Sequence, residues 1–211
     1  SQFKSTCVNI RPDWVEASDD FQFCRWRLGT PIKDPTLVRQ VAIKSVNSLG
    51  MTEFAETEGW VDFRSPSKVE LSCRRYLEDY PDLDSLLEEK GSVPLTLPKS
   101  LVESLERVGL FSGDTKENDL VLVDIRPGRL KIRGQGASSW WAEKKPLKDY
   151  KGPPLSFLVS PQLLIALINR DNRCLLARDR LMIRSEKWTW VTCLGQANEA
   201  REDGNEEATE E

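Results

Sequence analysis

The chain has 211 residues, of which 39% are hydrophobic and 30% are charged, and its formal net charge is −4. This composition is that of an ordinary globular protein with a substantial core. No apolar run approaches the roughly 18 residues that a transmembrane helix needs, which excludes that class. The five cysteines are scattered singly, which indicates reduced thiols and a cytoplasmic protein rather than a disulfide framework.

The first element that the pattern predicts is a hairpin in "VEASDDFQFCRW", residues 15–26. Its adjacent carboxylates, Asp19 and Asp20, fit either a metal or acid–base site or the tip of a turn. Consecutive residues of a strand point to opposite faces, and a turn would expose both carboxylates to water. We therefore favour the turn over the site.

Three helices follow, each introduced by a proline at an interval of 63 residues: Pro35, Pro98 and Pro161. Proline suits the first turn of a helix, where its missing N–H costs nothing. Apolar residues then recur at helical spacing, as in Leu101, Leu105 and Val108. Short β-type runs follow each helix. This predicts a repeated unit of one helix backed by several antiparallel strands, an α+β architecture.

Two connections stand out along the chain. The stretch 74–100 is charged and contains Pro81, Pro94 and Pro98, and we read residues 77–91 within it as the link between two domains. "RPGR" places Pro127 and Gly128 as a type II turn requires, and it joins strands at 120–125 and 130–133.

The last 17 residues, 195–211, contain seven acidic side chains and one Arg, and no large apolar residue. We expect this tail to be disordered. Since the whole chain carries −4, residues 1–194 carry +2, which is compatible with a polyanionic partner.

The residue types needed for catalysis are largely missing. The chain has no histidine and no Cys-x-x-Cys pair, which removes the commonest general base and the commonest zinc ligands. "GQGASSW" lacks the lysine of a phosphate-binding loop and does not open a helix. We therefore predict no catalytic site, no metal site, no cofactor and no enzymatic activity.

Several stretches together resemble the bacterial sliding clamp, the beta subunit of DNA polymerase III. "YPDLDSLL" is similar to the family's linker into its last domain. The stretches after it keep the order of that domain: "LPKSLVESLERVGLFSGDTKENDLVLVDIRPGRLKIRGQG", "YKGPPLSFLVSPQLLIAL" and "WTWVTCL". The resemblance covers residues 80–194 and implies a DNA-clamp fold of helix-plus-strand half-domains. Residues 1–79 would be part of a middle domain, 80–194 a complete C-terminal domain and 195–211 the acidic tail.

The resemblance also implies two sites. "SDDFQF" stands where the family's Thr-Asp-Gly-His-Arg-Leu segment helps to form a pocket for peptides of polymerases and the clamp loader. The pocket residues would be Ser18, Asp20, Phe21, Phe23, Leu86, Val191 and Cys193. The helices would face duplex DNA through Arg39, Lys44, Lys99, Arg107 and Arg170. Charge alone favours simple solvation of such polar side chains over contact with a nucleic acid.

Some residues depart from the family pattern. Asp20 and Phe21 replace its Gly and His, Gln22 replaces its Arg, and Glu88 stands where a Pro is usual. The family's usual partner specificity is therefore not carried over. The half-domain that opens the chain also lacks its own leading strand and helix. We expect either a longer natural chain or missing elements supplied by another subunit, with "STCVNI" as an exposed strand edge.

The function implied is a processivity factor in DNA replication that encircles duplex DNA as a homo-oligomer or together with a longer clamp chain. The alternative is a clamp-fold interaction module that binds a clamp or a polymerase without encircling DNA. The acidic tail and the nearly neutral helix faces favour the alternative, and the repeated units favour the first.

Overall fold

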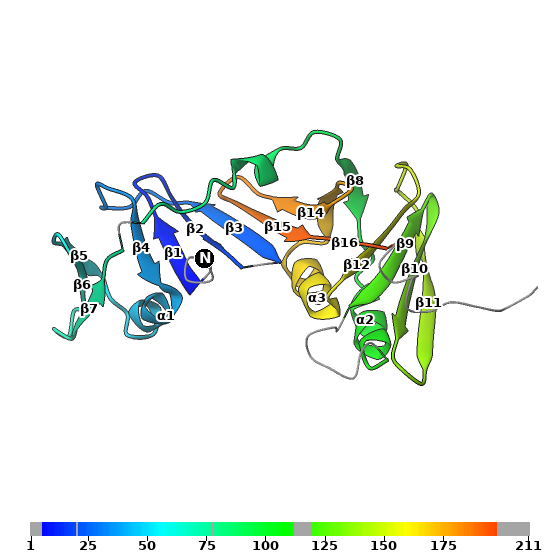
Figure 1. Cartoon of the computed structure of the whole chain (residues 1–211), viewed down its shortest axis with the longest axis horizontal. Helices are drawn as coiled ribbons and strands as arrows, with labels where there is room; N and C mark the ends of the chain where they lie inside the picture. The colour runs from blue at the N-terminus through cyan, green and yellow to red at the C-terminus, as the bar shows by residue number, and fades with distance from the viewer. Residues whose placement is uncertain (1–5, 20, 77, 112–119, 198–211) are drawn as a thin grey trace, which may run out of the picture. The chain divides into compact units, whose positions relative to one another are not determined.

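The computed structural model describes residues 6–19, 21–76, 78–111 and 120–197 (Figure 1). The chain divides into two compact units. The N-terminal unit comprises residues 1–88 and 184–191, and the C-terminal unit comprises residues 89–183 and 192–211. Each unit is built of antiparallel strands with helices packed on them.

The N-terminal unit contains a sheet with the strand order β4-β1-β2-β3-β15 and a separate sheet β5-β6-β7. Its elements are β1 (Cys7–Ile10), β2 (Trp14–Ser18), β3 (Gln22–Arg27), β4 (Thr36–Arg39), α1 (Gln40–Ser48), β5 (Glu53–Glu56), β6 (Trp60–Arg64), β7 (Glu70–Arg74), a 3-10 helix (Asp84–Leu87) and most of β15 (Trp188–Cys193). The buried side chains of Ile10, Val38 and Val61 form the centre of its core, and Ala42 and Ile43 of α1 pack against them.

The C-terminal unit contains strands in the order β14-β13-β8 and a five-stranded sheet β11-β10-β9-β12-β16. Its elements are β8 (Val93–Thr96), α2 (Leu101–Gly109), β9 (Val121–Arg126), β10 (Gly128–Gln135), β11 (Trp140–Leu147), β12 (Leu155–Val159), α3 (Pro161–Arg170), β13 (Arg173–Leu176), β14 (Arg180–Arg184) and β16 (Gly195–Gln196).

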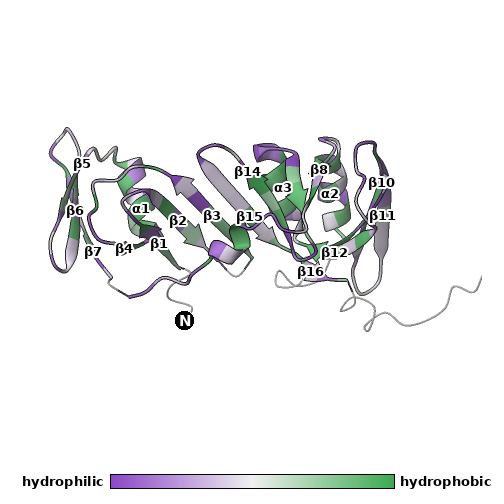
Figure 2. Ribbon diagram, turned by 90° about the horizontal axis from the view of Figure 1, so that it is seen from above, coloured by the Kyte–Doolittle hydropathy of each residue, from purple (hydrophilic) through white to green (hydrophobic). Residues whose placement is uncertain are grey.

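Helices α2 and α3 of this unit pack on each other, and α2 also contacts β10 and β11. Their buried faces carry the residues expected from the helical spacing, including Leu101, Leu105 and Val108 of α2. In Figure 2 the hydrophobic colouring of α3 and β14 shows part of the apolar residues of this unit. The approach of α2 to β10 requires a glycine, because a Cβ on Gly134 would lie only 2.2 Å from the carbonyl oxygen of Val108.

The α+β class and the predicted β-runs are confirmed. The "RPGR" turn is confirmed too, since Gly128 has a φ of +83° and Arg126 pairs with Arg129 across the hairpin. α3 begins at Pro161, as predicted. α2 begins three residues after Pro98, because a turn closes first, with the Leu101 N–H donating to the Pro98 carbonyl at 2.9 Å.

The first predicted helix starts in the wrong place. Residues 36–39 form strand β4, and α1 begins only at Gln40. Leu37 and Val38 are buried in the sheet and pair with Asn9 and Val8 of β1. Pairing with a distant strand therefore overrides the local helical spacing. The same pairing corrects a second expectation, because β1 is flanked by β2 and β4 and is not a sheet edge.

Two residues of the predicted tail belong to a strand. Gly195 and Gln196 form β16, which pairs with β12 through Leu158 and Phe157, so these two residues are ordered. The rest of the predicted tail, residues 198–211, lies outside the described residues. Within the described ranges, no helix is long and apolar enough to cross a membrane, and the longest of them, α3, has ten residues.

Candidate functional site

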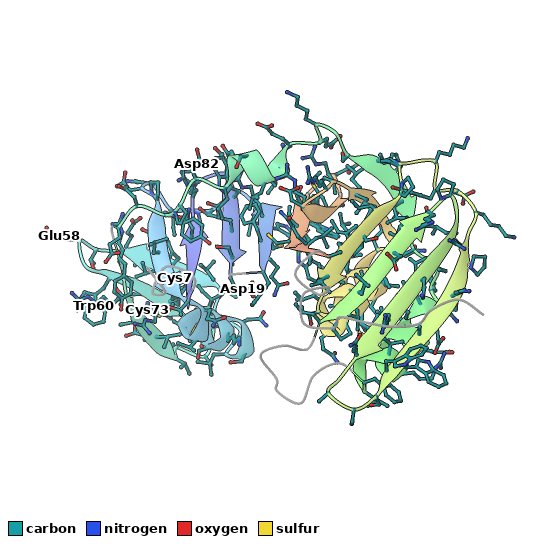
Figure 3. The ribbon with its side chains drawn as sticks, turned by 45° about the vertical axis from the view of Figure 1, so that its right-hand side comes forward. Cys7, Asp19, Glu58, Trp60, Cys73 and Asp82 are labelled. Carbon is teal, nitrogen blue, oxygen red and sulfur yellow. The ribbon has the colours of Figure 1, made fainter. Side chains whose placement is uncertain are left out.

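Asp19, the described member of the first candidate pair, lies at the turn of the β2–β3 hairpin (Figure 3). The Asp19 carboxylate accepts hydrogen bonds from the backbone N–H groups of Phe21 and Gln22, both at 2.8 Å, and from the Gln22 side chain at 2.9 Å. Its oxygens therefore stabilise the turn. Asp20 lies outside the described residues, and in the described part of the chain no group of acidic, Cys or His residues could hold a metal ion.

Three of the residues predicted to form the peptide pocket lie near one another in the N-terminal unit. Ser18, Phe23 and Val191 lie on the successive strands β2, β3 and β15. Phe23 and Val191 are only 2% and 0% exposed, so they belong to the core and present no surface to a ligand in this structure. Phe21 is 60% exposed, and Leu86 is half-buried on the 3-10 helix. Cys193 is exposed and belongs to the C-terminal unit.

The segment carrying Leu86 is held against the sheet by three polar contacts. The Tyr80 and Ser18 hydroxyls lie 2.8 Å apart. Arg25 forms an ion pair with Asp84 at 2.7 Å. Arg184 donates to the carbonyl oxygen of Leu87 at 2.6 Å. Because Tyr80 is buried, desolvation raises the pKa of its hydroxyl. The contacts place the 3-10 helix beside the β2–β3 hairpin.

A buried charge network underlies these contacts. Glu16 is 3% exposed, and its carboxylate accepts hydrogen bonds from Asn9 and Arg25, both at 2.7 Å. Arg25 bridges this carboxylate to Asp84, and both partners raise the pKa of its guanidinium against the opposing effect of burial. The ion pair of Glu16 with Arg25 was not predicted from the sequence. The hairpin itself contained a signal, because a turn at Asp19 places Glu16 directly opposite Arg25.

The predicted DNA-facing residues lie on or beside the helices of the two units. Arg39 precedes α1 and Lys44 lies on it, both exposed. Lys99 is exposed just before α2, Arg107 is in the last turn of α2, and Arg170 is the final residue of α3.

The charge of Arg107 is compensated within the C-terminal unit. Its guanidinium donates to Glu143 of β11 at 2.7 and 2.9 Å. Glu143 also accepts hydrogen bonds from Ser104 at 2.6 Å and from the Trp141 indole at 3.1 Å. These donors, Arg107 first, lower the pKa of Glu143 from 4.5 to about 2 despite partial burial. α2 therefore offers less positive charge than its sequence indicates.

No protein-family model matches the chain, and no curated protein matches it in sequence. Solved structures do match. The DNA polymerase III subunit beta of Pseudomonas aeruginosa aligns with a TM-score of 0.75 at 13% identity over 92% of this chain. Caulobacter crescentus pol III beta aligns with a TM-score of 0.77 at 13% identity over 93%. The Pseudomonas aeruginosa DnaN sliding clamp bound to griselimycin aligns with a TM-score of 0.74 at 14% identity.

These comparisons define the class of the fold. The chain has the DNA-clamp fold of bacterial sliding clamps, as the resemblance of its sequence implied. It spans only 58–60% of the length of the clamps named here. At this level of identity the likeness concerns the fold alone.

Proposed function

We propose that the protein is a clamp-like DNA replication factor that tethers partner proteins to duplex DNA in the cytoplasm and has no enzymatic activity of its own. The observation that carries the proposal is the clamp fold, which extends over 92% of the chain. In domain terms, residues 1–79 are part of a middle clamp domain and residues 80–194 are a complete last domain. A ring closes either by homo-oligomerisation or by association with a longer clamp chain.

Duplex DNA is held by the helices through sequence-independent contacts to phosphates, which position a protein without reading bases. The residues for these contacts are Arg39, Lys44, Lys99 and Arg170, all exposed. Arg107 contributes less, because its charge is compensated by Glu143. A small number of weak phosphate contacts suits a protein that slides.

Partner peptides of a polymerase or clamp loader bind beside the β2–β3 hairpin. Phe21 and Leu86 are the accessible apolar anchors, and Ser18 and Asp20 form the polar edge of the pocket. Phe23 and Val191 support it from the core. An apolar surface with a few polar groups suits short peptides that carry Leu or aromatic anchors.

One observation favours the alternative of a clamp-fold module that binds a clamp or polymerase without encircling DNA. Besides the compensated Arg107, α2 carries the exposed acidic residues Glu103 and Glu106. This leaves the helix with little attraction for phosphates.

Retention on circular DNA distinguishes the two functions. The complete protein is incubated with a nicked circular duplex, separated by gel filtration at moderate salt, and analysed again after the circle is cut once. An encircling protein stays on the circle and leaves the linear form, whereas equal loss from both forms contradicts ring closure. Light scattering on the free protein gives the number of chains in the assembly.

Charge reversal tests whether the DNA passes along the helices. Lys44→Glu combined with Lys99→Glu should abolish retention on the circle. The matched control, Lys33→Glu with Lys90→Glu, makes the same change in net charge at exposed positions outside the helices and should leave retention unchanged. Equal loss in both double variants would show that net charge, rather than the helices, determines binding.

A further inference from the structure

The sheet of the C-terminal unit carries a group of positive charges on the face that α2 does not cover. Along β10 the residues Leu130, Ile132 and Gly134 are buried, so the alternate residues Arg129, Lys131 and Arg133 face the other side. Residues directly opposite each other share a face of a sheet, and Lys144 of β11 lies opposite Lys131 while Arg126 of β9 lies opposite Arg129. The three strands together present a face with five basic residues: Arg126, Arg129, Lys131, Arg133 and Lys144.

This basic face has almost no acidic compensation. A hollow of about 200 Å³ is lined by four of the bases and by one acid, Asp124. Asp124 accepts a hydrogen bond from the hydroxyl of Ser156. In the part of the chain that the structure describes, the four lining bases form no ion pair. Glu143, the acid of β11, lies on the opposite side of the sheet, where it binds Arg107.

The pairing of the strands places like charges against each other twice, at Lys131 with Lys144 and at Arg126 with Arg129. Like charges directly opposite each other destabilise a sheet. A bound anion would remove that repulsion. The arrangement is therefore costly for folding alone and suited to binding phosphates.

An aromatic side chain lies at one end of the basic stripe. Trp140 of β11 is 62% exposed, and the guanidinium of Arg133 lies over its ring, 5.3 Å from the ring centroid. The Nε of Arg133 has no hydrogen-bond partner among the described residues. Exposed aromatic rings beside cations are the means by which proteins bind unpaired bases, since every base has a face that can stack.

We infer that this face, formed by β9, β10 and β11, binds a single-stranded nucleic acid. The phosphates contact Lys131, Lys144 and the two arginines at the far end, and one base stacks on Trp140. From Arg129 to Gln135 the stripe is roughly 20 Å long at about 3.4 Å per residue, which accommodates a few nucleotides. A duplex fits less well, because its bases are paired and stacked and cannot cover Trp140. This site is separate from the helices proposed to face duplex DNA and does not depend on ring closure.

The test is fluorescence anisotropy with the complete protein and a labelled 20-nucleotide oligothymidine, at several salt concentrations. We expect binding that weakens as salt rises, as for any phosphate-directed contact, and that is tighter than binding of a duplex of the same length. Lys131→Glu with Lys144→Glu should weaken binding at least about tenfold and reduce the salt dependence. The control is Lys33→Glu with Lys90→Glu, which makes the same change in net charge and should have no such effect.

Stacking has its own test. Trp140→Ala should weaken binding at least about fivefold, whereas Trp140→Phe should retain most of the affinity, because phenylalanine also stacks. Circular dichroism verifies that each variant is folded, and Lys131→Gln with Lys144→Gln replaces the reversed pair if that pair misfolds.

Three results would overturn the inference: equal loss in the control and in the Lys131/Lys144 variant, preference for the duplex, or no binding by the complete protein at low salt. If the complete protein does not bind at low salt, a further variant tests whether the acidic tail covers the basic face. If changing Glu206, Glu207, Glu210 and Glu211 to Gln creates binding, the acidic tail of the chain occupies the face in place of a nucleic acid.

Discussion

The substitution Glu143→Gln tests the cluster in which Arg107, Ser104 and Trp141 donate hydrogen bonds to Glu143. Four hydrogen bonds from Arg107, Ser104 and Trp141 lower the pKa of this carboxyl from 4.5 to about 2. At 1.36 kcal/mol per pKa unit, the full shift corresponds to about 3 kcal/mol of stability. The Arg107 side chain is 48% exposed, and solvent screening reduces the expected loss to about 1–2 kcal/mol at pH 7.

The direction of the pKa shift determines how this loss of stability depends on pH. A carboxyl whose pKa is lower in the folded state stabilises the protein above its unfolded pKa, and this stabilisation is lost as the pH falls through the folded pKa. The difference between wild type and Glu143→Gln should therefore be constant above about pH 5 and shrink between pH 4.5 and about 2. Urea unfolding followed by circular dichroism measures it. Glu103→Gln on α2 is the control and should cost at most about 0.5 kcal/mol. A Glu143→Gln loss no larger than that of the control would refute the cluster.

Three further predictions concern single positions in the two units. Arg25→Met leaves the buried Glu16 carboxylate without its cation and should cost about 3–5 kcal/mol; adding Glu16→Gln should recover part of that loss, and additive losses would contradict the network. Gly134→Ala places a methyl group against the main chain of α2 and should destabilise the protein by about 1–3 kcal/mol, so an unchanged thermal midpoint would contradict the packing. Burial raises the pKa of the Cys174 thiol to about 12. In the folded protein at pH 8, Cys174 should resist Ellman's reagent while the exposed Cys193 reacts; equal rates would contradict its burial.

Local chemistry explains which elements could be predicted from the sequence. The turn at Gly128 and the start of α3 at Pro161 depend on backbone preferences of one or two residues, and both predictions are confirmed. The start of α1 was wrong, because Leu37 and Val38 pair with strand β1, about 30 residues earlier. No local pattern shows that a partner strand will be present. The helical spacing of Leu37 and Val38 was therefore wrongly interpreted as the start of the helix.

Site residues whose partners are close in sequence could also be interpreted correctly, whereas those with distant partners could not. Asp19 was understood from its neighbours, since its partners Phe21 and Gln22 lie within three residues. Arg107 was interpreted as a free cation, because its partner Glu143 lies 36 residues away on a different element. The basic face of β10 was overlooked for a related reason. It becomes visible only when the register places Lys144 opposite Lys131.

The central claim is that the helices of this clamp fold face duplex DNA. Its most direct measurement is site-specific photocrosslinking on a nicked circular duplex, with p-benzoylphenylalanine replacing Lys44 or Lys99. The control position is Glu58, which is exposed in the β5–β6 turn (Figure 3). Crosslinks to DNA are expected from Lys44 on α1 and from Lys99 just before α2, with only background from Glu58. A yield from Glu58 equal to or above that from Lys44 and Lys99 would contradict it.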